Sequence, residues 1–229
     1  MRGSDIAPGR IEDISTRWSQ LGDPVQFMFR YGPAIRRYLS ALLDNPADVE
    51  DISQDIVVSV INAGFAHASP DKGRFRNYLK TSVRNAAFKH RSRKRPGQLS
   101  NAAAEQLGGP DAERDWVDEW RRCALARAWA EIEAFQERTR GNLFATVLRL
   151  RMEHPKADSS ELAAKASELA GRHVGESAAR QQLSRARKKF AELLVDEARR
   201  TLENPTPEAV RDELIEVGLM PWVRGYVEL

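Results

Sequence analysis

The spacing of the apolar residues constrains this fold most, because it follows the period of an α-helix. In residues 47–61 the apolar side chains recur three and four positions apart and project onto one stripe, formed by Val49, Ile52, Ile56 and Val60. Glycine and proline cluster between stretches of this kind, and no alternating run reaches a useful strand length. The sequence therefore predicts an all-α protein.

One stretch of the 229-residue chain, PGQLSNAAAEQLGGP at 96–110, is poor in large apolar residues. That composition is typical of a linker. We therefore predict two small helical domains joined by a flexible linker. The expected parts are an N-terminal arm (1–20), a first domain (21–95), the linker (96–115), a second domain (116–200) and a helical tail (201–229).

The bulk composition limits the location and the chemistry of the protein. The formal net charge is only +3, but the charges are segregated locally. We find no run of about 18 apolar residues, so we expect no membrane association. The single cysteine, Cys123, cannot form an internal disulfide, which fits a reducing cytoplasm.

An enzyme is not expected from this sequence. The 4 histidines lie far apart, and none has a metal-ligand spacing to Cys123. We find neither a glycine-rich phosphate loop nor a nucleophile elbow. We therefore predict no catalytic residue, no metal and no cofactor. Cys123 and the tryptophans of its amphipathic stretch, Trp116, Trp120 and Trp129, are interpreted as core residues.

The first functional candidate is the basic stretch GRFRNYLKTSVRNAAFKHRSRKR at 73–95. Its expected apolar face is Phe75, Leu79, Val83 and Ala86. Basic residues four positions apart suit a track for nucleic-acid phosphates, and asparagines among them can read base edges. A solvated basic face is the equally open alternative. The candidate DNA contacts are Arg76, Asn77, Lys80, Arg84, Asn85, Lys89 and Arg91.

The second candidate is an acidic cluster on the preceding helix, made of Asp48, Glu50, Asp51, Gln54 and Asp55. A metal site is disfavoured because carboxylates along a helix point outward, whereas hard cations need converging oxygens. A carboxylate at a helix N-terminus also has a purely structural explanation in the helix dipole. A docking surface for a basic protein is the functional alternative.

The third candidate is a helix-turn-helix near the C-terminus. Asp158 or Ser159 can cap its first helix, with Glu161 in the first turn. The second helix has an apolar face of Ala179, Leu183, Ala186, Phe190 and Leu193. Arginine and glutamine are the side chains that make bidentate contacts to guanine and adenine, although an ordinary surface helix can also be basic. The opposite face carries Ser177, Arg180, Gln181, Ser184, Arg185 and Lys188.

At this point the sequence resembles a known family. DVEDISQDI looks like the region 2 core-binding helix of extracytoplasmic-function (ECF) sigma factors. GRFRNYLKTSVRNAAFKHRSRKR is similar to the helix that opens the −10 element, and QQLSRARKKFAELL looks like the region 4 helix that reads the −35 element. The motifs occur in the family's order. The long stretch EWRRCALARAWAEIEAF and the tail resemble a subgroup with an extended region 4 and a C-terminal tail.

The resemblance implies a role for each candidate surface. The first domain would be sigma region 2, and the second would be sigma region 4. The acidic cluster would bind core RNA polymerase at its clamp, with the flap as a second contact, and the loop at 64–73 would capture an unstacked base. The factor would direct promoter recognition, DNA melting and transcription initiation. An anti-sigma factor or a Ser/Thr kinase acting on Thr81 would be a further partner.

The sequence departs from the family pattern at a few positions. Tyr78 stands where the family often has tryptophan, and Lys89 where it often has aspartate. The distance from Glu161 to Leu183 exceeds the usual helix-turn-helix, which leaves the register of the first helix open. Two alternatives also stay open: a stand-alone helix-turn-helix regulator that does not bind polymerase, and a protein-interaction adaptor. The regulator predicts a dimer on a palindromic site, and the adaptor predicts no salt-sensitive DNA binding.

Overall fold

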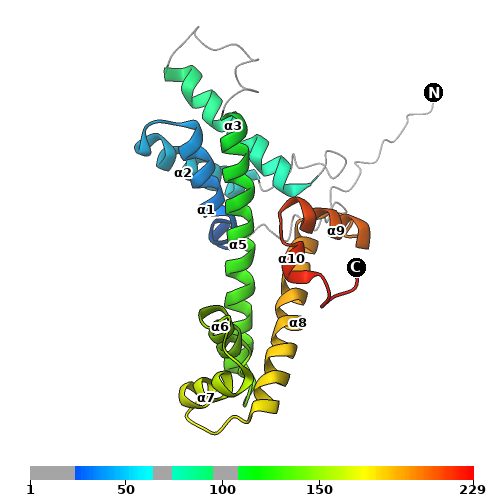
Figure 1. Cartoon of the computed structure of the whole chain (residues 1–229). Coiled ribbons are helices and arrows are strands. Elements are labelled where there is room, and N and C mark those ends of the chain that lie inside the picture. Colours follow the sequence, from blue (N-terminus) through cyan, green and yellow to red (C-terminus); the bar gives the residue numbers. More distant parts are fainter. Residues whose placement is uncertain (1–23, 64–73, 95–107) are drawn as a thin grey trace, which may run out of the picture.

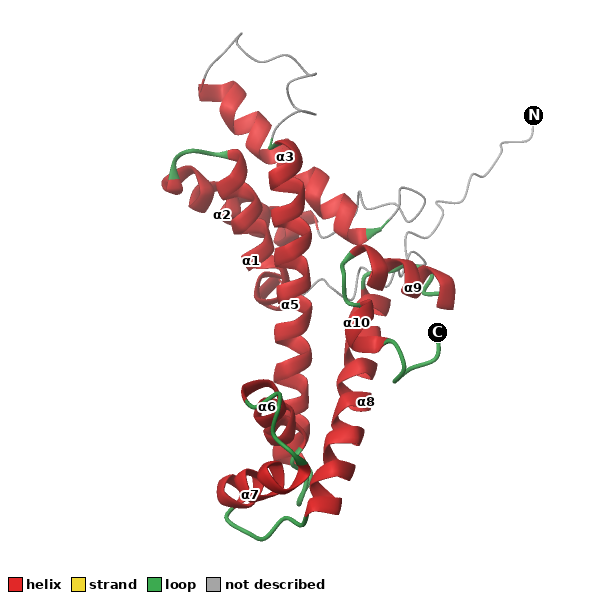
Figure 2. Ribbon diagram, in the orientation of Figure 1, coloured by secondary structure: helices red, strands yellow, loops and turns green. Residues whose placement is uncertain are grey.

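The described residues of the computed structural model, 24–63, 74–94 and 108–229, are helical or lie in short connections, and none of them forms a strand (Figure 2). The first part of the chain forms α1 (Pro24–Leu42), α2 (Pro46–Ala63) and α3 (Phe75–Lys94). The rest forms α5 (Gly109–Arg138), α6 (Phe144–Glu153), α7 (Ser159–Ala170), α8 (Glu176–Arg200), α9 (Pro207–Glu216) and α10 (Met220–Val223). The predicted all-α class is confirmed.

The 30-residue helix α5 is the axis of the molecule. Figure 1 shows α1, α2 and α3 around its first half, α6 and α7 at its other end, and α8 running beside it. α9 and α10 follow α8 and turn back beside the first half of α5. The helices therefore form two packed groups that share α5 and α8.

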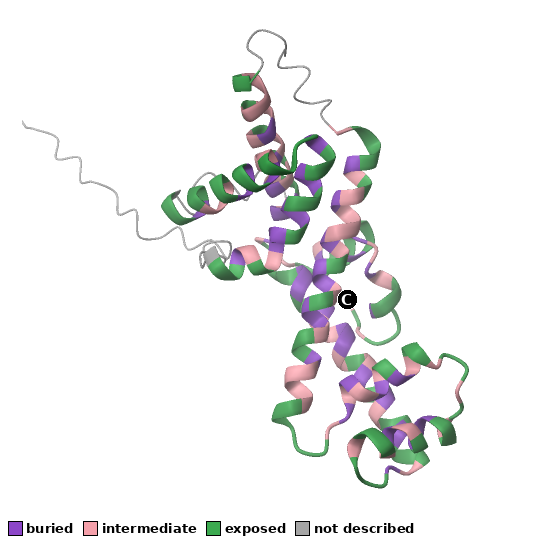
Figure 3. Cartoon of the chain, turned by 90° about the vertical axis from the view of Figure 1, so that its left-hand side faces the viewer, coloured by how far each residue is buried: buried purple, intermediate pink, exposed green. Residues whose placement is uncertain are grey.

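The first group has an aromatic core to which α5 contributes as much as α1. The Trp120 ring stacks on Tyr31 with 4.8 Å between centroids, and Trp116 lies 5.3 Å from Tyr38. Phe75 of α3 completes the cluster, 5.4 Å from Tyr31. Trp116 is fully buried, which agrees with its prediction as a core residue. Buried positions line the inner sides of these helices, as Figure 3 shows.

The start of α5 differs from the expected linker. Residues 108–115, expected in the linker, form the turn and first two turns of α5, and residues 96–107 lie outside the described part of the chain. Gly108 has φ of 98°, and a Cβ there would lie 2.6 Å from the Leu42 side chain. The helix begins this early because Ala112 and Trp116 bury their apolar surface against the first group, which linker composition alone does not reveal.

The second group is a small three-helix core made by α6, α7 and the first half of α8. It buries Leu143, Val147, Leu150, Leu162, Ala163, Ala166, Val174, Ala179, Leu183 and Ala186. Of the two predicted cap residues, Asp158 caps α7: its side chain accepts a hydrogen bond from the Glu161 N–H at 2.9 Å, and the Glu161 side chain accepts one from the Asp158 N–H. The Ser167 hydroxyl accepts a hydrogen bond from the Val174 N–H at 2.9 Å and so fixes the turn.

The apolar stripes shift by one residue at their C-terminal ends. On α3 the apolar face was expected to end at Ala86, but Ala87 is the buried residue. On α8 Leu194 is buried more deeply than the expected Leu193. Each predicted stripe ends with a step of three residues, whereas the buried residues continue in steps of four, from Val83 to Ala87 and from Phe190 to Leu194. With 3.6 residues per turn, either step stays near the same face of the helix, so periodicity alone does not decide which of the two residues is buried.

A buried carboxylate ties the two groups together. Glu197 of α8 accepts hydrogen bonds from Arg127 of α5 at 2.5 Å, from Arg30 of α1 at 3.1 Å and from Arg200 at 2.8 Å. Burial alone would raise the pKa of Glu197, but the charges and the hydrogen bond of these arginines outweigh burial and lower the pKa below 4.5. Glu197 is therefore a charged connection between α1, α5 and α8.

Replacement of Trp116 by alanine tests whether α5 belongs to the first core. We expect Trp116→Ala to lower the free energy of unfolding by about 3–5 kcal/mol, because it leaves a large cavity beside Tyr38. Urea unfolding followed by circular dichroism measures this loss. Trp222→Ala, at a side chain that is 42% exposed, is the control and should change stability much less. Equal effects would mean that α5 is not part of this core.

Replacement of Glu197 by alanine tests the buried connection. Removal of one partner leaves buried arginines unpaired, so we expect a loss of about 3–5 kcal/mol near neutral pH. Asp196→Ala, at an exposed neighbour, should cost at most about 1 kcal/mol.

The stabilisation that charged Glu197 provides should depend on pH in a defined direction. The folded pKa of Glu197 is lowered, so its contribution is complete above the ordinary value of 4.5 and is lost as the pH falls through the folded pKa. The wild type and a Glu197→Gln variant should therefore converge in stability on acidification, as measured by urea unfolding over a pH series. A constant difference across that series would contradict the assignment.

Candidate protein and nucleic-acid interfaces

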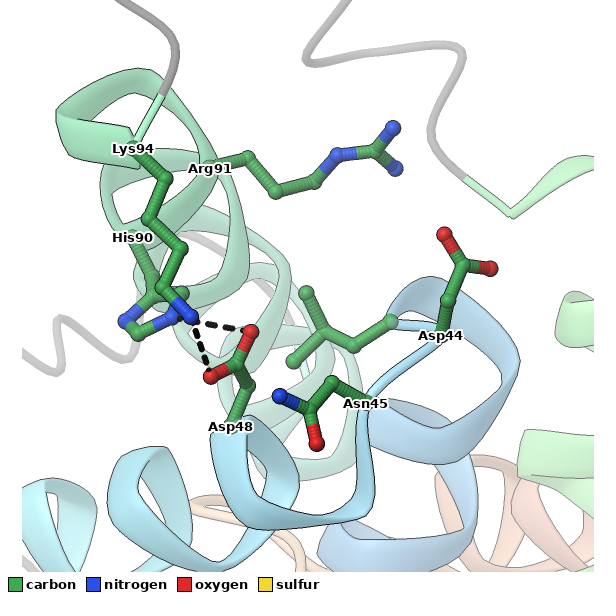
Figure 4. Close-up of a pocket in the computed structure, with 7 residues that line it drawn as sticks. Asp44, Asn45, Asp48, His90, Arg91 and Lys94 are labelled. Carbon is green, nitrogen blue, oxygen red and sulfur yellow. Dashed lines mark hydrogen bonds and ion pairs between the residues drawn. The ribbon is translucent and has the colours of Figure 1, made fainter.

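The acidic cluster on α2 divides into an exposed part and a paired part. Glu50, Asp51, Gln54 and Asp55 are exposed. Asp48 instead accepts a hydrogen bond from Lys94 at 2.6 Å and lies 3.3 Å from His90, both on α3 (Figure 4). The hydrogen bond from Lys94 lowers the pKa of Asp48, and this effect together with the nearby His90 outweighs partial burial. Asp48 therefore joins α2 to α3, and the exposed cluster begins at Glu50.

Asp48 lies in a pocket of about 260 Å³ at the turn between α1 and α2. Figure 4 shows Asp44 and Asn45 on one side and His90, Arg91 and Lys94 on the other. Arg91, a candidate DNA contact, donates a hydrogen bond to the Leu42 carbonyl at 3.2 Å. These contacts show how the C-terminal end of α3 is fixed on the α1–α2 turn.

Two exposed apolar residues extend the acidic cluster and were missed by the sequence reasoning. Val58 and Ile61 are 52% and 58% exposed and lie on the same face of α2 as Asp51 and Asp55. Their spacing from Gln54, at i+4 and i+7, was the available signal. The exposed face of α2 is therefore acidic near its start and apolar near its end.

The candidate DNA contacts on α3 lie on two different faces. Asn77, Asn85 and Lys89 are exposed, and Thr81 lies between them. Lys80 and Arg84 are partly exposed at the side that faces α5, and Lys80 forms an ion pair with Glu113 of α5. The exposed face of α3 is therefore polar over most of its length and becomes basic only near its C-terminal end, from Lys89 on. The loop at 64–73 lies outside the described residues.

Arg76 is the candidate that the structure places furthest from solvent. Its side chain is 5% exposed, and it donates hydrogen bonds to Glu213 at 3.1 Å and to Glu216 at 2.8 Å, both on α9. Burial opposes the charge of Arg76, but the hydrogen bonds and charges of both glutamates outweigh burial and raise its pKa. In this arrangement Arg76 does not reach solvent, contrary to the exposed phosphate track that the sequence indicated.

The candidate DNA contacts on α8 all lie on one open face. The exposed residues are Ser177, Arg180, Gln181, Ser184, Arg185 and Lys188. Gln182, on the side of the helix, accepts a hydrogen bond from the Leu143 N–H and donates one to the Gly141 carbonyl, both at 3.3 Å. These contacts anchor α8 to the turn before α6 while its opposite face stays free. The structure thus brings together the complete set predicted for this helix.

Two further surveys apply to the described residues alone. Among residues 24–63, 74–94 and 108–229 no group of three or more His, Cys, Asp or Glu side chains is placed to hold a metal ion. In the same ranges, none of the helices has the length and apolar character needed to cross a membrane. Cys123 is buried as predicted, and burial raises the pKa of its thiol.

Comparison with known proteins gives one match. Residues 28–96 match the family model described as Sigma-70 region 2. A search of curated proteins and a search of solved structures each returned no match. The matched segment contains α1 from its second turn, all of α2 and all of α3, and so it includes the exposed face of α2 and both faces of α3. The first helical group is therefore similar to Sigma-70 region 2.

Proposed function

We propose that the chain is a sigma factor of the ECF type, which binds core RNA polymerase and directs promoter recognition, DNA melting and transcription initiation. The observation that carries this proposal is the match to Sigma-70 region 2 at 28–96, in which an exposed acidic helix precedes a polar and basic helix. The helix-turn-helix at α6–α8 follows it in the order that such a factor needs.

The exposed face of α2 is the proposed contact with the polymerase clamp. Asp51 and Asp55 give it a negative charge, which steers a basic partner into register. Val58 and Ile61 add apolar surface that is worth about 25 cal/mol for each Å² removed from water. A partner helix surface with basic and apolar residues would fit this face.

The exposed face of α3 is the proposed contact with the −10 element. Asn77 and Asn85 can donate to and accept from base edges, and Lys89 can meet a phosphate. Thr81 lies exposed on the same face, where a Ser/Thr kinase would reach its hydroxyl. Added phosphate would repel a DNA strand there, so modification of Thr81 would weaken promoter opening.

The exposed face of α8 is the proposed contact with the −35 element. Arg180 and Arg185 can make bidentate contacts to guanine, and Gln181 can do the same with adenine. The helix is held from behind by the second core and by Gln182, so its residues are presented on a rigid support. α3 and the start of α8 lie at opposite ends of α5, a helix about 45 Å long.

Charge reversal on α2 tests the polymerase contact. We expect the double variant Asp51→Lys, Asp55→Lys to lose co-elution with core RNA polymerase in size-exclusion chromatography, because two attractive contacts become repulsive. Glu208→Lys, Asp212→Lys is the matched control, since these residues are also exposed and four positions apart on a helix. The control should co-elute like the wild type.

The outcomes of that experiment separate the proposal from its alternative. Failure of the wild type to co-elute at micromolar concentration would overturn the sigma-factor assignment. A dimer that binds a palindromic duplex would then identify a stand-alone helix-turn-helix regulator. Equal loss in both double variants would show that α2 is not the docking surface.

Alanine substitutions on α8 test the −35 contact. With a mapped promoter, Arg180→Ala and Arg185→Ala should each weaken holoenzyme binding by about 1–3 kcal/mol, with core association intact. Arg199→Ala, at an exposed arginine near the other end of α8, is the control. Normal transcription from both test variants would show that α8 does not read the promoter.

A further inference from the structure

Two glutamates of the C-terminal tail hold two arginines at the start of α3. Glu213 and Glu216 of α9 each form ion pairs with both Arg74 and Arg76. Arg76 and Glu213 are almost completely buried, with side chains 5% and 2% exposed. Arg74 and Glu216 form the outer edge of the cluster, at 21% and 52% exposed. The result is a compact cluster of charges with a buried centre and an open rim.

The tail is fixed to the C-terminal half of the molecule, independently of this cluster. Val210, Leu214 and Val217 are buried, and their part of the core is continuous with α5, α8 and α10. Thr206 caps α9 by accepting a hydrogen bond from the Ala209 N–H at 3.2 Å. α9 thus reaches α3 with charged side chains, while its buried apolar residues hold it in the core.

The same side of α3 carries a second ion pair of this kind. Lys80, one helical turn after Arg76, forms an ion pair with Glu113 of α5. Two residues of the basic stripe predicted to contact DNA phosphates, Arg76 and Lys80, are therefore met by carboxylates from α9 and α5. A carboxylate and a phosphate bind a guanidinium through the same forked geometry. A phosphate can therefore replace a carboxylate on these arginines, provided that the displaced glutamate reaches solvent, as the 52% exposed Glu216 already does.

We propose that Arg74 and Arg76 form a phosphate-binding site for a DNA strand, and that Glu213 and Glu216 of the tail occupy this site as an internal competitor. The inference rests on the proposed function, in which α3 contacts promoter DNA. Exchange begins at the open rim, where the ion pairs of Arg74 and Glu216 are the weaker ones. The tail thus limits access of DNA to α3 until the phosphates of a strand displace its two carboxylates from the arginines.

Neutralisation of the two glutamates tests the competition. We compare the wild type with Glu213→Gln, Glu216→Gln by fluorescence anisotropy on a labelled single-stranded DNA of mixed sequence, over a salt series. Arg74 and Arg76 would then each be free to contact a DNA phosphate. These two additional contacts should steepen the slope of log affinity against log salt by about 1.4. The affinity should rise about 25-fold at 0.1 M salt if the affinities converge at 1 M.

A matched variant separates a local effect from a general change in charge. Glu208→Gln, Asp212→Asn also removes two negative charges from α9, at exposed positions away from the cluster. It should leave the slope unchanged. Arg76→Ala, added to Glu213→Gln, Glu216→Gln, should abolish part of the gain, because the new contact is made by that arginine.

These DNA-binding measurements test the proposed competition separately from the sigma-factor assignment. A slope and affinity equal to those of the matched variant would overturn it, as would a gain that survives Arg76→Ala in full. If Glu213→Gln, Glu216→Gln fails to fold by circular dichroism, Glu216→Gln replaces it and should show a smaller change in the same direction. Failure of the wild type to bind polymerase would overturn the sigma-factor assignment but leave this comparison readable, because it uses DNA alone.

Discussion

The packing of Trp116 and Trp120 against Tyr31, Tyr38 and Phe75 is the contact on which the rest of the molecule depends. It seals the first helical group with a helix that comes after 96–107 in the chain. Because α5 continues for 30 residues, the same element then carries the second helical group at its far end. The distance between the two proposed DNA-facing surfaces is therefore set by one straight helix as well as by chain connectivity.

Two buried glutamates add directional contacts to this apolar frame. Glu197 and Glu213 both come from the C-terminal half, and each compensates arginines of the first group. Apolar packing tolerates small slips between helices, whereas a buried carboxylate must meet its arginines or remain uncompensated at a cost of several kcal/mol. These glutamates therefore select one arrangement of the two groups. The two glutamates have different effects. Glu197 connects α1, α5 and α8, whereas Glu213 is paired with Arg76, a residue that the sequence made a candidate DNA contact.

The sequence was informative wherever a property is local to one helix. The cap at Asp158 and the open face of α8 follow from residues within a few positions of each other, so helical periodicity was enough to predict them. Arg76 was assigned to an exposed track because its partner, Glu213, lies 137 positions further along the chain. The early start of α5 escaped prediction for the same reason. Trp116 was interpreted as core, but nothing local showed that its core includes Tyr38 of α1.

The two helices proposed to contact DNA differ in how accessible their side chains are, and under the proposed function this difference affects the order of events. The contacts of α8 are exposed and need no rearrangement, so the −35 surface is ready to bind. On α3 the asparagines are open, but Arg74, Arg76 and Lys80 are already paired with carboxylates. A DNA strand gains those contacts only by displacing the carboxylates. This displacement lowers the affinity of α3 for a strand that no other part of the protein holds. Stable engagement of α3 therefore depends on the strand being held first by other contacts, such as those of α8 on the same promoter.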